Sequence, residues 1–214
     1  MSVLKSCSTL HDKPWFHYTV KNYFEENLLN SLLKQIDTFP FNPSRDDFRD
    51  EFNLNYQSNN QTISSILDTF LQKDNINFLS SIDNRFNKCT KMLRVSIWKD
   101  FTGLCLPVHT DSIYKLFTMQ IYLPRNAEMD YGTTFYDEEE NFVKKTDYTL
   151  NDGYFFFPNI NKIKTNHSFV EDIKRERCSI IFNIIDKQKY TETNSTALDK
   201  RLRRAKKALN FIEF

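Results

Sequence analysis

Residues 106–117, LPVHTDSIYKLF, place a histidine and an aspartate two positions apart in a run that otherwise has the composition of a buried strand. Side chains at i and i+2 of a strand project from the same face, so His109 and Asp111 can converge on one point if the strand continues through Thr110. An imidazole nitrogen and a carboxylate oxygen together suit a borderline metal such as Fe(II). The pair alone is a weak signal, because a surface turn capped by Asp111 explains it equally well.

A metal held by this pair needs a third protein ligand, and the chain contains four histidines. His11 and His17 precede the predicted helices, and His17 stands in an alternating run, where a structural histidine is the commoner case. His167 follows the apolar run GYFFFP, near the start of another predicted strand, and is the best candidate. Two histidines and one carboxylate on a β scaffold form the facial triad of non-haem iron sites, which leaves positions open for a cosubstrate and oxygen.

The run RERCSIIFNII, which follows His167, divides into a polar and an apolar face. Alternation puts Arg177, Ser179, Ile181 and Asn183 on one side, and Cys178, Ile180, Phe182 and Ile184 on the other. A buried arginine is costly unless it meets an anion, and its planar fork suits a carboxylate that Ser179 can also contact. The sequence therefore predicts a cosubstrate that carries a carboxylate and chelates the metal.

These motifs, in this order and at this spacing, resemble those of the Fe(II)/2-oxoglutarate-dependent oxygenases, in particular the small, prolyl-hydroxylase-like members. The resemblance rests on His109-Thr110-Asp111, His167 and Arg177-Cys178-Ser179. It extends through residues 92–186, where YGTTFYD and NDGYFFFPNINKIKTNHSF look like strands of the family's double-stranded β-helix, a jelly-roll or cupin-like core. The opening PWFHYTVKNYFEENLLNSLL is loosely similar to the strand and helix that precede this core.

The resemblance implies that His109, Asp111 and His167 bind Fe(II), and that Arg177 and Ser179 bind the distal carboxylate of 2-oxoglutarate. It also implies hydroxylation of a C–H bond with O2, while 2-oxoglutarate is decarboxylated to succinate and CO2. The presence of the carboxylate ligand argues against a halogenase, which needs that position for halide.

Several cosubstrate assignments stay open. Tyr122 occupies a position where such enzymes often offer a phenol to the distal carboxylate, although an ordinary strand aromatic explains it nearly as well. Arg175 shares the strand parity of Arg177 and is its main competitor, and Arg94 and Lys115 are lesser candidates. Where related sequences frequently have a tyrosine before the first histidine, this chain reads IWKD, so the partner of the inner carboxylate is unassigned.

The substrate is not encoded in these motifs, because the family's fold serves many substrates. A small molecule is favoured, with a prolyl-type protein or peptide hydroxylase as the alternative, and a non-catalytic β-barrel binding protein as the alternative from another class. We expect residues 42–61 and the segment YDEEENFVKK to shape the substrate entrance, and its acidic run to be a hairpin tip. Four aromatic residues are candidates for its lining: Tyr114, Tyr131, Phe135 and Tyr136.

The elements that must position these residues change in character along the chain. A strand is predicted over 15–20, a helix over 24–36, a polar loop over 42–61, and two further helices around 63–71 and 76–85. From residue 92, short β-branched and aromatic runs separated by turns predict an antiparallel sheet core, so the class is α+β. Gly132 is expected to allow close approach of two strands. We predict three regions within one domain. Residues 1–91 form a strand and helical support region, residues 92–188 the catalytic core, and residues 189–214 a basic C-terminal helix.

The tail STALDKRLRRAKKALNFIEF predicts an amphipathic helix with a basic face. It is expected to pack on the domain or on a second subunit to form a homodimer, and contact with a membrane surface or nucleic acid is the alternative.

Composition narrows the class of protein. A formal net charge of +1 over 214 residues argues against binding of nucleic acid by bulk electrostatics. No apolar run is long enough to span a bilayer, and the first residues lack the apolar centre of a signal peptide. The four cysteines have no paired spacing, so we expect free thiols and a cytoplasmic location.

Overall fold

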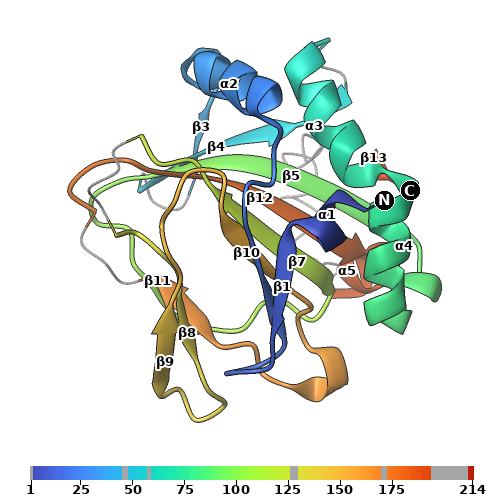
Figure 1. Ribbon diagram of the computed structural model, residues 1–214. Helices are drawn as coiled ribbons and strands as arrows, with labels where there is room; N and C mark the ends of the chain where they lie inside the picture. The colour runs from blue at the N-terminus through green and yellow to red at the C-terminus, as the bar shows by residue number, and fades with distance from the viewer. Residues whose placement is uncertain (1, 45–47, 57–58, 126–129, 170–172, 194–211) are drawn as a thin grey trace.

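The computed structural model describes residues 2–44, 48–56, 59–125, 130–169, 173–193 and 212–214 and has an α+β fold, as the sequence predicts (Figure 1). Its α-helices are α1 (Val3–Ser6), α2 (Glu26–Gln35), α3 (Gln61–Leu71), α4 (Lys73–Ile82) and α5 (Lys187–Thr193), with 3₁₀ turns η1 (Ile36–Thr38), η3 (Asn84–Asn87) and η4 (Ile160–Lys162). Its strands are β1 (Ser8–His11), β2 (His17–Val20), β3 (Asn42–Ser44), β4 (Arg49–Leu54), β5 (Lys91–Asp100), β6 (Leu106–His109), β7 (Lys115–Tyr122), β8 (Thr134–Tyr136), β9 (Phe142–Lys145), β10 (Gly153–Phe156), β11 (His167–Phe169), β12 (Arg177–Asp186) and β13 (Ile212–Glu213).

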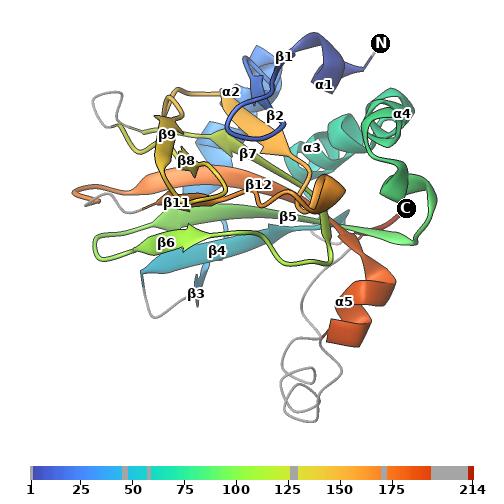
Figure 2. The same ribbon diagram turned by 90° about the horizontal axis from the view of Figure 1, so that it is seen from below.

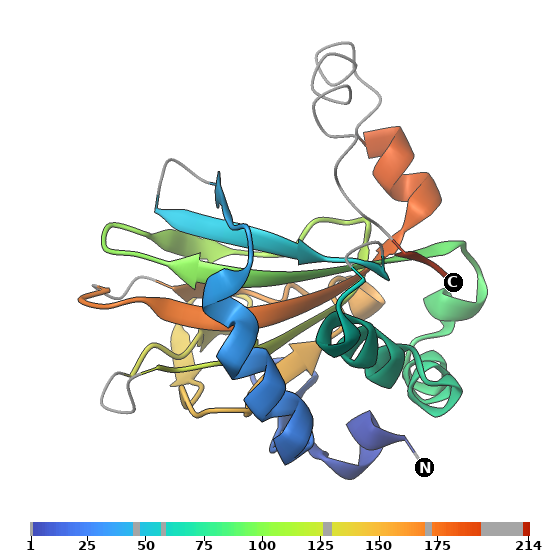
Figure 3. The same cartoon turned by 90° about the horizontal axis from the view of Figure 1, so that it is seen from above.

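A nine-stranded antiparallel sheet is the centre of the fold. Its order is β1-β2-β10-β7-β12-β5-β4-β3, with β13 added beside β5. Helices α2, α3 and α4 lie across one face of this sheet (Figure 3). Apolar side chains of α3 recur at Ile63, Ile66, Leu67 and Phe70, the spacing of one helical face, and the Phe70 ring stacks on Phe182 of β12 at 4.8 Å between centroids. The predicted packing of N-terminal helices on one sheet is therefore confirmed.

The opposite face of the large sheet looks toward a second, four-stranded sheet of order β6-β11-β8-β9 (Figure 2). Aromatic side chains fill much of the space between the sheets, among them Trp15, Phe135, Tyr154 and Phe156. This second core holds the two layers at a fixed spacing, and the small sheet carries the histidine-bearing strands β6 and β11.

The prediction of a loop over residues 42–61 is wrong, because this segment contains the hairpin β3–β4 at the edge of the large sheet. Strand β4 alternates between two environments: Phe52 and Leu54 pack into the helix-covered core, while Arg49 and Glu51 face the opposite side. The polar residues point into a cavity and not into an apolar core, so the strand lacks the hydropathy signal on which the prediction depended.

Other element boundaries differ from the predictions by a few residues. The strand predicted from residue 15 begins at His17, and the third helix ends at Ile82, followed by the turn η3. Most of the predicted C-terminal helix lies outside the described residues, but Ile212–Glu213 form a strand paired with β5, so the helix does not include them. All four cysteines are free, as predicted. Within the described ranges, no helix is long and apolar enough to cross a membrane.

Gly132 lies where the chain before β8 approaches the chain after β9. A Cβ at this position would lie 1.7 Å from the carbonyl oxygen of Thr146, so no side chain fits without moving backbone. We expect Gly132→Ala to lower the free energy of unfolding by about 3 kcal/mol, measured by urea denaturation. At Gly103, a Cβ would meet only the ring of the exposed Phe48, which can move, so Gly103→Ala is expected to cost less despite its positive φ. Equal losses in the two variants would contradict this account.

Candidate metal and cosubstrate site

A cavity of about 100 Å³ lies between the two sheets. The small sheet contributes His109 and His167 to its wall, and Asp111 follows His109 in the chain. The large sheet contributes Thr118, Gln120, Tyr154 and Arg177. The structure thus brings the three predicted metal ligands and the predicted anion-binding arginine to one cavity, which we call the inner cavity.

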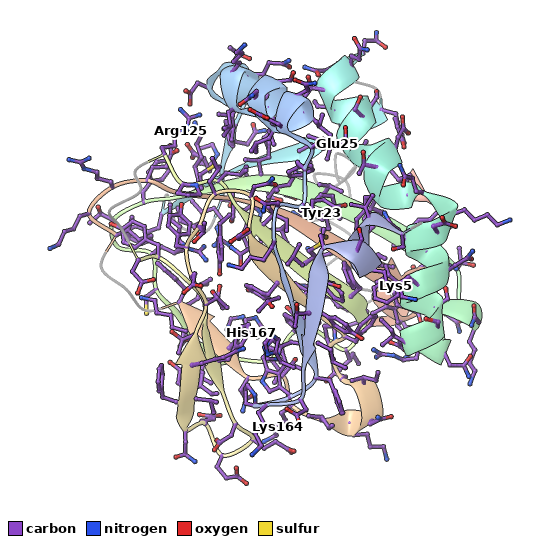
Figure 4. The ribbon with its side chains drawn as sticks, in the orientation of Figure 1. Lys5, Tyr23, Glu25, Arg125, Lys164 and His167 are labelled. Carbon is purple, nitrogen blue, oxygen red and sulfur yellow. The ribbon has the colours of Figure 1, made fainter. Side chains whose placement is uncertain are left out.

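The two histidines stand on neighbouring strands. His167 of β11 pairs in register with His109 of β6, and their ring centroids lie 4.4 Å apart. Figure 4 shows His167 in the interior, between the small sheet and strands of the large one. Nδ1 of His109 donates to the Pro107 carbonyl at 2.7 Å, and Nδ1 of His167 donates to the Thr165 carbonyl at 2.8 Å. These bonds fix the tautomers, so both Nε2 lone pairs are available to a metal.

Asp111 makes strong contacts with the large sheet. Its two carboxylate oxygens accept from Nζ of Lys115 and Oγ1 of Thr118, each at 2.6 Å. Burial raises the pKa of Asp111, but the Lys115 ammonium, His167 and the two hydrogen bonds outweigh burial and lower the pKa to about 2. Across the part of the chain that the structure describes, no three histidine, cysteine, aspartate or glutamate side chains already stand in a metal-holding group. A metal at this site therefore requires Asp111 to share or give up one of these bonds.

His167 is neutral near pH 7. Its side chain is buried, and desolvation lowers its pKa to about 4, with Asp111 opposing and His109 adding to the shift. The neutral imidazole is the form that binds metals, so no proton must be displaced at neutral pH.

The depressed pKa of His167 predicts acid destabilisation of the metal-free protein. Between pH 6.5 and about 4 the unfolded chain binds a proton that the folded chain excludes, so stability falls as the pH drops through this window. We expect a loss of about 3 kcal/mol from this group, measured as urea midpoints from pH 7 to 4.5. His17, whose pKa is also lowered to about 4 by burial, adds a similar dependence. His167→Gln should remove only the first part, and an unchanged pH slope in that variant would contradict the prediction.

Three charged side chains form a continuous row across the large sheet. Arg49 of β4, Asp100 of β5 and Arg177 of β12 are register partners, and each is at most 2% exposed. Asp100 accepts from Arg49 Nε through one oxygen and from Arg177 Nη1, at 2.8 Å, through the other. One buried carboxylate thus serves two guanidinium groups, and the three side chains together carry one formal positive charge.

Of the two arginines that the sequence left in competition, Arg177 is buried and lines the inner cavity, whereas Arg175 is exposed in the turn before β12. Hydrogen bonds to Asp100, to the Tyr131 carbonyl and to Thr133 occupy three of the five N–H groups of Arg177. The remaining donors can serve a carboxylate in the cavity.

Two other predicted cosubstrate residues have protein partners. The Tyr122 hydroxyl lies 3.0 Å from Thr133 Oγ1 and 2.6 Å from Thr146 Oγ1, and the Ser179 hydroxyl accepts from Gln120 at 2.9 Å. A different phenol, Tyr154 of β10, lines the inner cavity, and its hydroxyl also has protein partners, Gln120 Oε1 at 2.8 Å and Thr133 Oγ1 at 3.1 Å. Burial raises the pKa of Tyr154 well above its usual range, so this phenol stays protonated.

A second cavity of about 310 Å³, which we call the outer cavity, adjoins the inner one. It shares five lining residues with the inner cavity: Arg49, Trp98, His109, Asp111 and Lys115. Arg94 and Tyr114 also line it, and so do Ser44 and Glu51 from the hairpin that the sequence assigned to a loop. Residues 42–61, which the sequence predicts to shape the substrate entrance, therefore contribute Ser44, Arg49 and Glu51 to the wall of the outer cavity.

The remaining candidate lining residues lie elsewhere. Tyr131 and Phe135 are buried in the aromatic core between the sheets, and the Tyr136 hydroxyl lies 2.9 Å from Ser168 Oγ. The acidic run 137–140 is the exposed turn between β8 and β9, as predicted.

Sequence reasoning did not single out Arg49, Asp100, Trp98 or Tyr154. For Asp100 a signal exists, because a buried aspartate at a strand end predicts a buried cation nearby. For Arg49 none exists until β4 is known to be a strand.

Neither protein-family models nor curated protein sequences match this chain significantly. Solved structures do match its fold. A 2OG-Fe(II) oxygenase family oxidoreductase from Burkholderia pseudomallei is similar at a TM-score of 0.58 and 12% identity, over 79% of this chain and 84% of that one. A Pseudomonas putida prolyl-4-hydroxylase gives 0.57 and 12%, over 80% and 92% of the two chains. The dioxygenase for auxin oxidation from Arabidopsis thaliana, solved with 2-oxoglutarate, gives 0.58 and 12%, over 79% and 83%. The chain therefore has the fold of the 2OG-Fe(II) oxygenases, the family that its sequence motifs resemble.

Proposed function

We propose that this protein is an Fe(II)- and 2-oxoglutarate-dependent oxygenase that hydroxylates a C–H bond of a small molecule. The observation that carries the proposal is the inner cavity, where two paired histidines on one sheet face a buried arginine on the other. In this proposal the two sheets form the double-stranded β-helix, or jelly roll, of the family whose fold the chain shares.

The donor set fits Fe(II). In His109 and His167, Nδ1 donates to a backbone carbonyl, which leaves Nε2 to face a metal, and Asp111 is ionised at neutral pH. Two imidazoles and one carboxylate are the ligands of the facial triad. Iron and the keto acid, when bound, supply the activation of O2 and the hydroxylation, with decarboxylation of 2-oxoglutarate to succinate and CO2.

The large sheet carries side chains that suit the distal carboxylate of the keto acid. Arg177 has donors left after its protein contacts, and its planar fork suits a carboxylate. Thr133 and Tyr154 add hydroxyl groups beside it, 3.1 Å from each other. Together these groups bind and orient the cosubstrate, while the aromatic core between the sheets excludes water from it.

The outer cavity supports a small-molecule substrate. Its volume of about 310 Å³ lies at the lower end of the range for small-ligand sites. A prolyl-type hydroxylase is the alternative, since one neighbour in fold is a prolyl-4-hydroxylase.

The test is an anaerobic titration of the protein with Fe(II) and 2-oxoglutarate, following the weak visible absorption band of the chelated keto acid. We expect the wild type to form the band and Arg177→Gln to need at least about a hundredfold more 2-oxoglutarate, because a charge-assisted bidentate contact is lost. Arg175→Gln is the matched control, since Arg175 is exposed outside the cavity, and should titrate as the wild type does.

A non-catalytic binding protein with the same fold is the second candidate. The observation that favours it is the engagement of both Asp111 oxygens by Lys115 and Thr118. If folded wild-type protein forms no band with Fe(II) and 2-oxoglutarate, the oxygenase proposal fails and this candidate replaces it.

A further inference from the structure

The carboxylate of Asp111 is held by two donors of different kinds. Oδ1 accepts from the Lys115 ammonium and Oδ2 from the Thr118 hydroxyl, each at 2.6 Å. The first donor is a cation on a flexible chain of methylene groups, whereas the second is a neutral group on a β-branched side chain buried in β7. A divalent metal at Oδ1 competes with the ammonium but is compatible with the hydroxyl at Oδ2.

The backbone around this carboxylate is fixed independently of the ion pair. The amide of Lys115 donates to the Ser112 carbonyl at 2.9 Å and closes a turn. The amide of Asp186, at the end of β12, donates to the Tyr114 carbonyl at 2.9 Å and anchors this turn to the large sheet. Loss of the contact between the ammonium and Oδ1 therefore leaves the backbone after Asp111 in place.

The outer cavity offers space for a displaced Lys115 ammonium. Lys115 lines both cavities, and the outer one has a volume of about 310 Å³. The Lys115 side chain is 20% exposed, compared with 8% for Asp111, so rotation of the lysine side chain can carry its charge toward water while the carboxylate stays buried. Exchange of the ammonium for a metal thus leaves neither charge buried and unpaired.

We propose that Lys115 is an exchangeable counter-ion of the metal site: its ammonium holds Oδ1 of Asp111 until a divalent metal displaces it, while Thr118 keeps Oδ2. This inference rests on the proposed function in taking His109, Asp111 and His167 as the metal ligands. Thr118 is a positioning residue that orients the carboxylate, and Lys115 is a competitor of the metal. The two partners of one carboxylate therefore have opposite effects on metal affinity.

The experiment is isothermal titration calorimetry of the full chain with Mn(II), a divalent ion that is stable in air at neutral pH. We expect Lys115→Met to bind Mn(II) at least about tenfold more tightly than the wild type, because the metal no longer displaces an ammonium. Thr118→Val keeps the shape of its side chain and is expected to bind Mn(II) at least about tenfold more weakly, because the carboxylate loses an orienting hydrogen bond.

Arg94→Gln is the matched control for Lys115→Met. It removes one positive charge from the wall of the same outer cavity, but the hydrogen bonds of Arg94 go to Glu51 and Asn53. Loss of long-range repulsion alone would tighten Mn(II) binding equally in both variants, whereas exchange at Oδ1 should leave the affinity of Arg94→Gln within about threefold of the wild type. Equal tightening in these two variants, or changes of the same sign in Lys115→Met and Thr118→Val, would overturn the proposal.

A measurement on the wild type makes the test independent of how well any variant folds. Acetylation by an N-hydroxysuccinimide ester, followed by peptide mass spectrometry, measures the reactivity of each lysine. We expect saturating Mn(II) to raise the acetylation rate of Lys115 at least about threefold, because its ammonium is no longer held by a carboxylate. Lys99, which pairs with Asp37, is the matched control and should react at the same rate with and without the metal. An unchanged or lower rate at Lys115 in protein that binds Mn(II) would overturn the proposal.

The titrations separate this inference from the proposed function. If the wild type binds Mn(II) and Lys115→Met binds it no more tightly, the inference fails and the oxygenase proposal stands. If Lys115→Met binds Mn(II) and the wild type does not, Lys115 is established as a competitor of the metal, while the oxygenase proposal gives way to the non-catalytic binding protein. If neither protein binds Mn(II), both proposals fail.

Discussion

His167→Ala is expected to lower the affinity for Fe(II) at least about a hundredfold and to abolish the absorption band with 2-oxoglutarate. His167 is the buried member of the histidine pair, and its tautomer is fixed by the Thr165 carbonyl, so its Nε2 is the better organised of the two nitrogen donors. Loss of this donor leaves one exposed imidazole and one carboxylate that is bonded to Lys115 and Thr118. Such a remnant has too few ligands to hold Fe(II) at micromolar concentration. The measurement is anaerobic equilibrium dialysis of iron, followed by the optical titration.

His11→Ala provides the control for this prediction. His11 lies on the edge strand β1 and contacts Thr19 at 3.0 Å, so it shares no partner with the proposed ligands. Its removal should leave iron binding unchanged. Retention of tight, stoichiometric Fe(II) binding in His167→Ala would mean that the iron binds at another site.

Asp100→Ala is expected to lower the free energy of unfolding by about 3–5 kcal/mol. Asp100 is fully buried and bridges Arg49 and Arg177, so its removal leaves two guanidinium groups facing each other without their shared anion. Asp100→Asn keeps the shape and one acceptor oxygen but not the charge, and should be intermediate. Urea denaturation at pH 7 measures both.

The effect of 2-oxoglutarate on stability distinguishes loss of the Asp100 charge from simple loss of packing. With the internal carboxylate gone, a bound dicarboxylate can take its place, so 2-oxoglutarate should raise the urea midpoint of Asp100→Asn more than that of the wild type. Asp37 offers a matched control, since it bridges Lys99 and Arg125 on the surface and its side chain is 61% exposed. Asp37→Ala should cost no more than about 1 kcal/mol. Equal losses for the two aspartates would contradict the role given to the buried row.

The placement of the candidate site residues was predictable from sequence wherever a single strand carried the signal. Alternation along β12 correctly separated Arg177 from the core-facing Cys178, and the structure places His109 and His167 side by side, as the predicted convergence required. These inferences needed only the two-residue period of a strand.

What depends on register between strands could not be predicted. Tyr122 and Tyr154 both point inward, but Tyr122 pairs with Ser179 and bonds to two threonines, whereas Tyr154 pairs with Gln120 and reaches the inner cavity. Parity alone cannot separate them. Arg49 required a further step, because its strand has a polar face turned toward a cavity, and such a face lacks the apolar pattern by which strands are recognised.

Because the candidate site is divided between two sheets, the spacing of the sheets restricts the length of a ligand that can contact both. The two proposed histidine ligands lie on the small sheet and the guanidinium groups on the large one, and the aromatic layer formed by Trp15, Phe135 and Tyr154 sets the separation between them. A ligand that contacts both the histidines and the guanidinium groups spans two rigid walls. We therefore expect keto diacids one methylene shorter or longer than 2-oxoglutarate to contact only one wall. The ligand in turn ties the walls together, so amide hydrogens of β11 and β12, far apart in sequence, should exchange more slowly in concert when it binds.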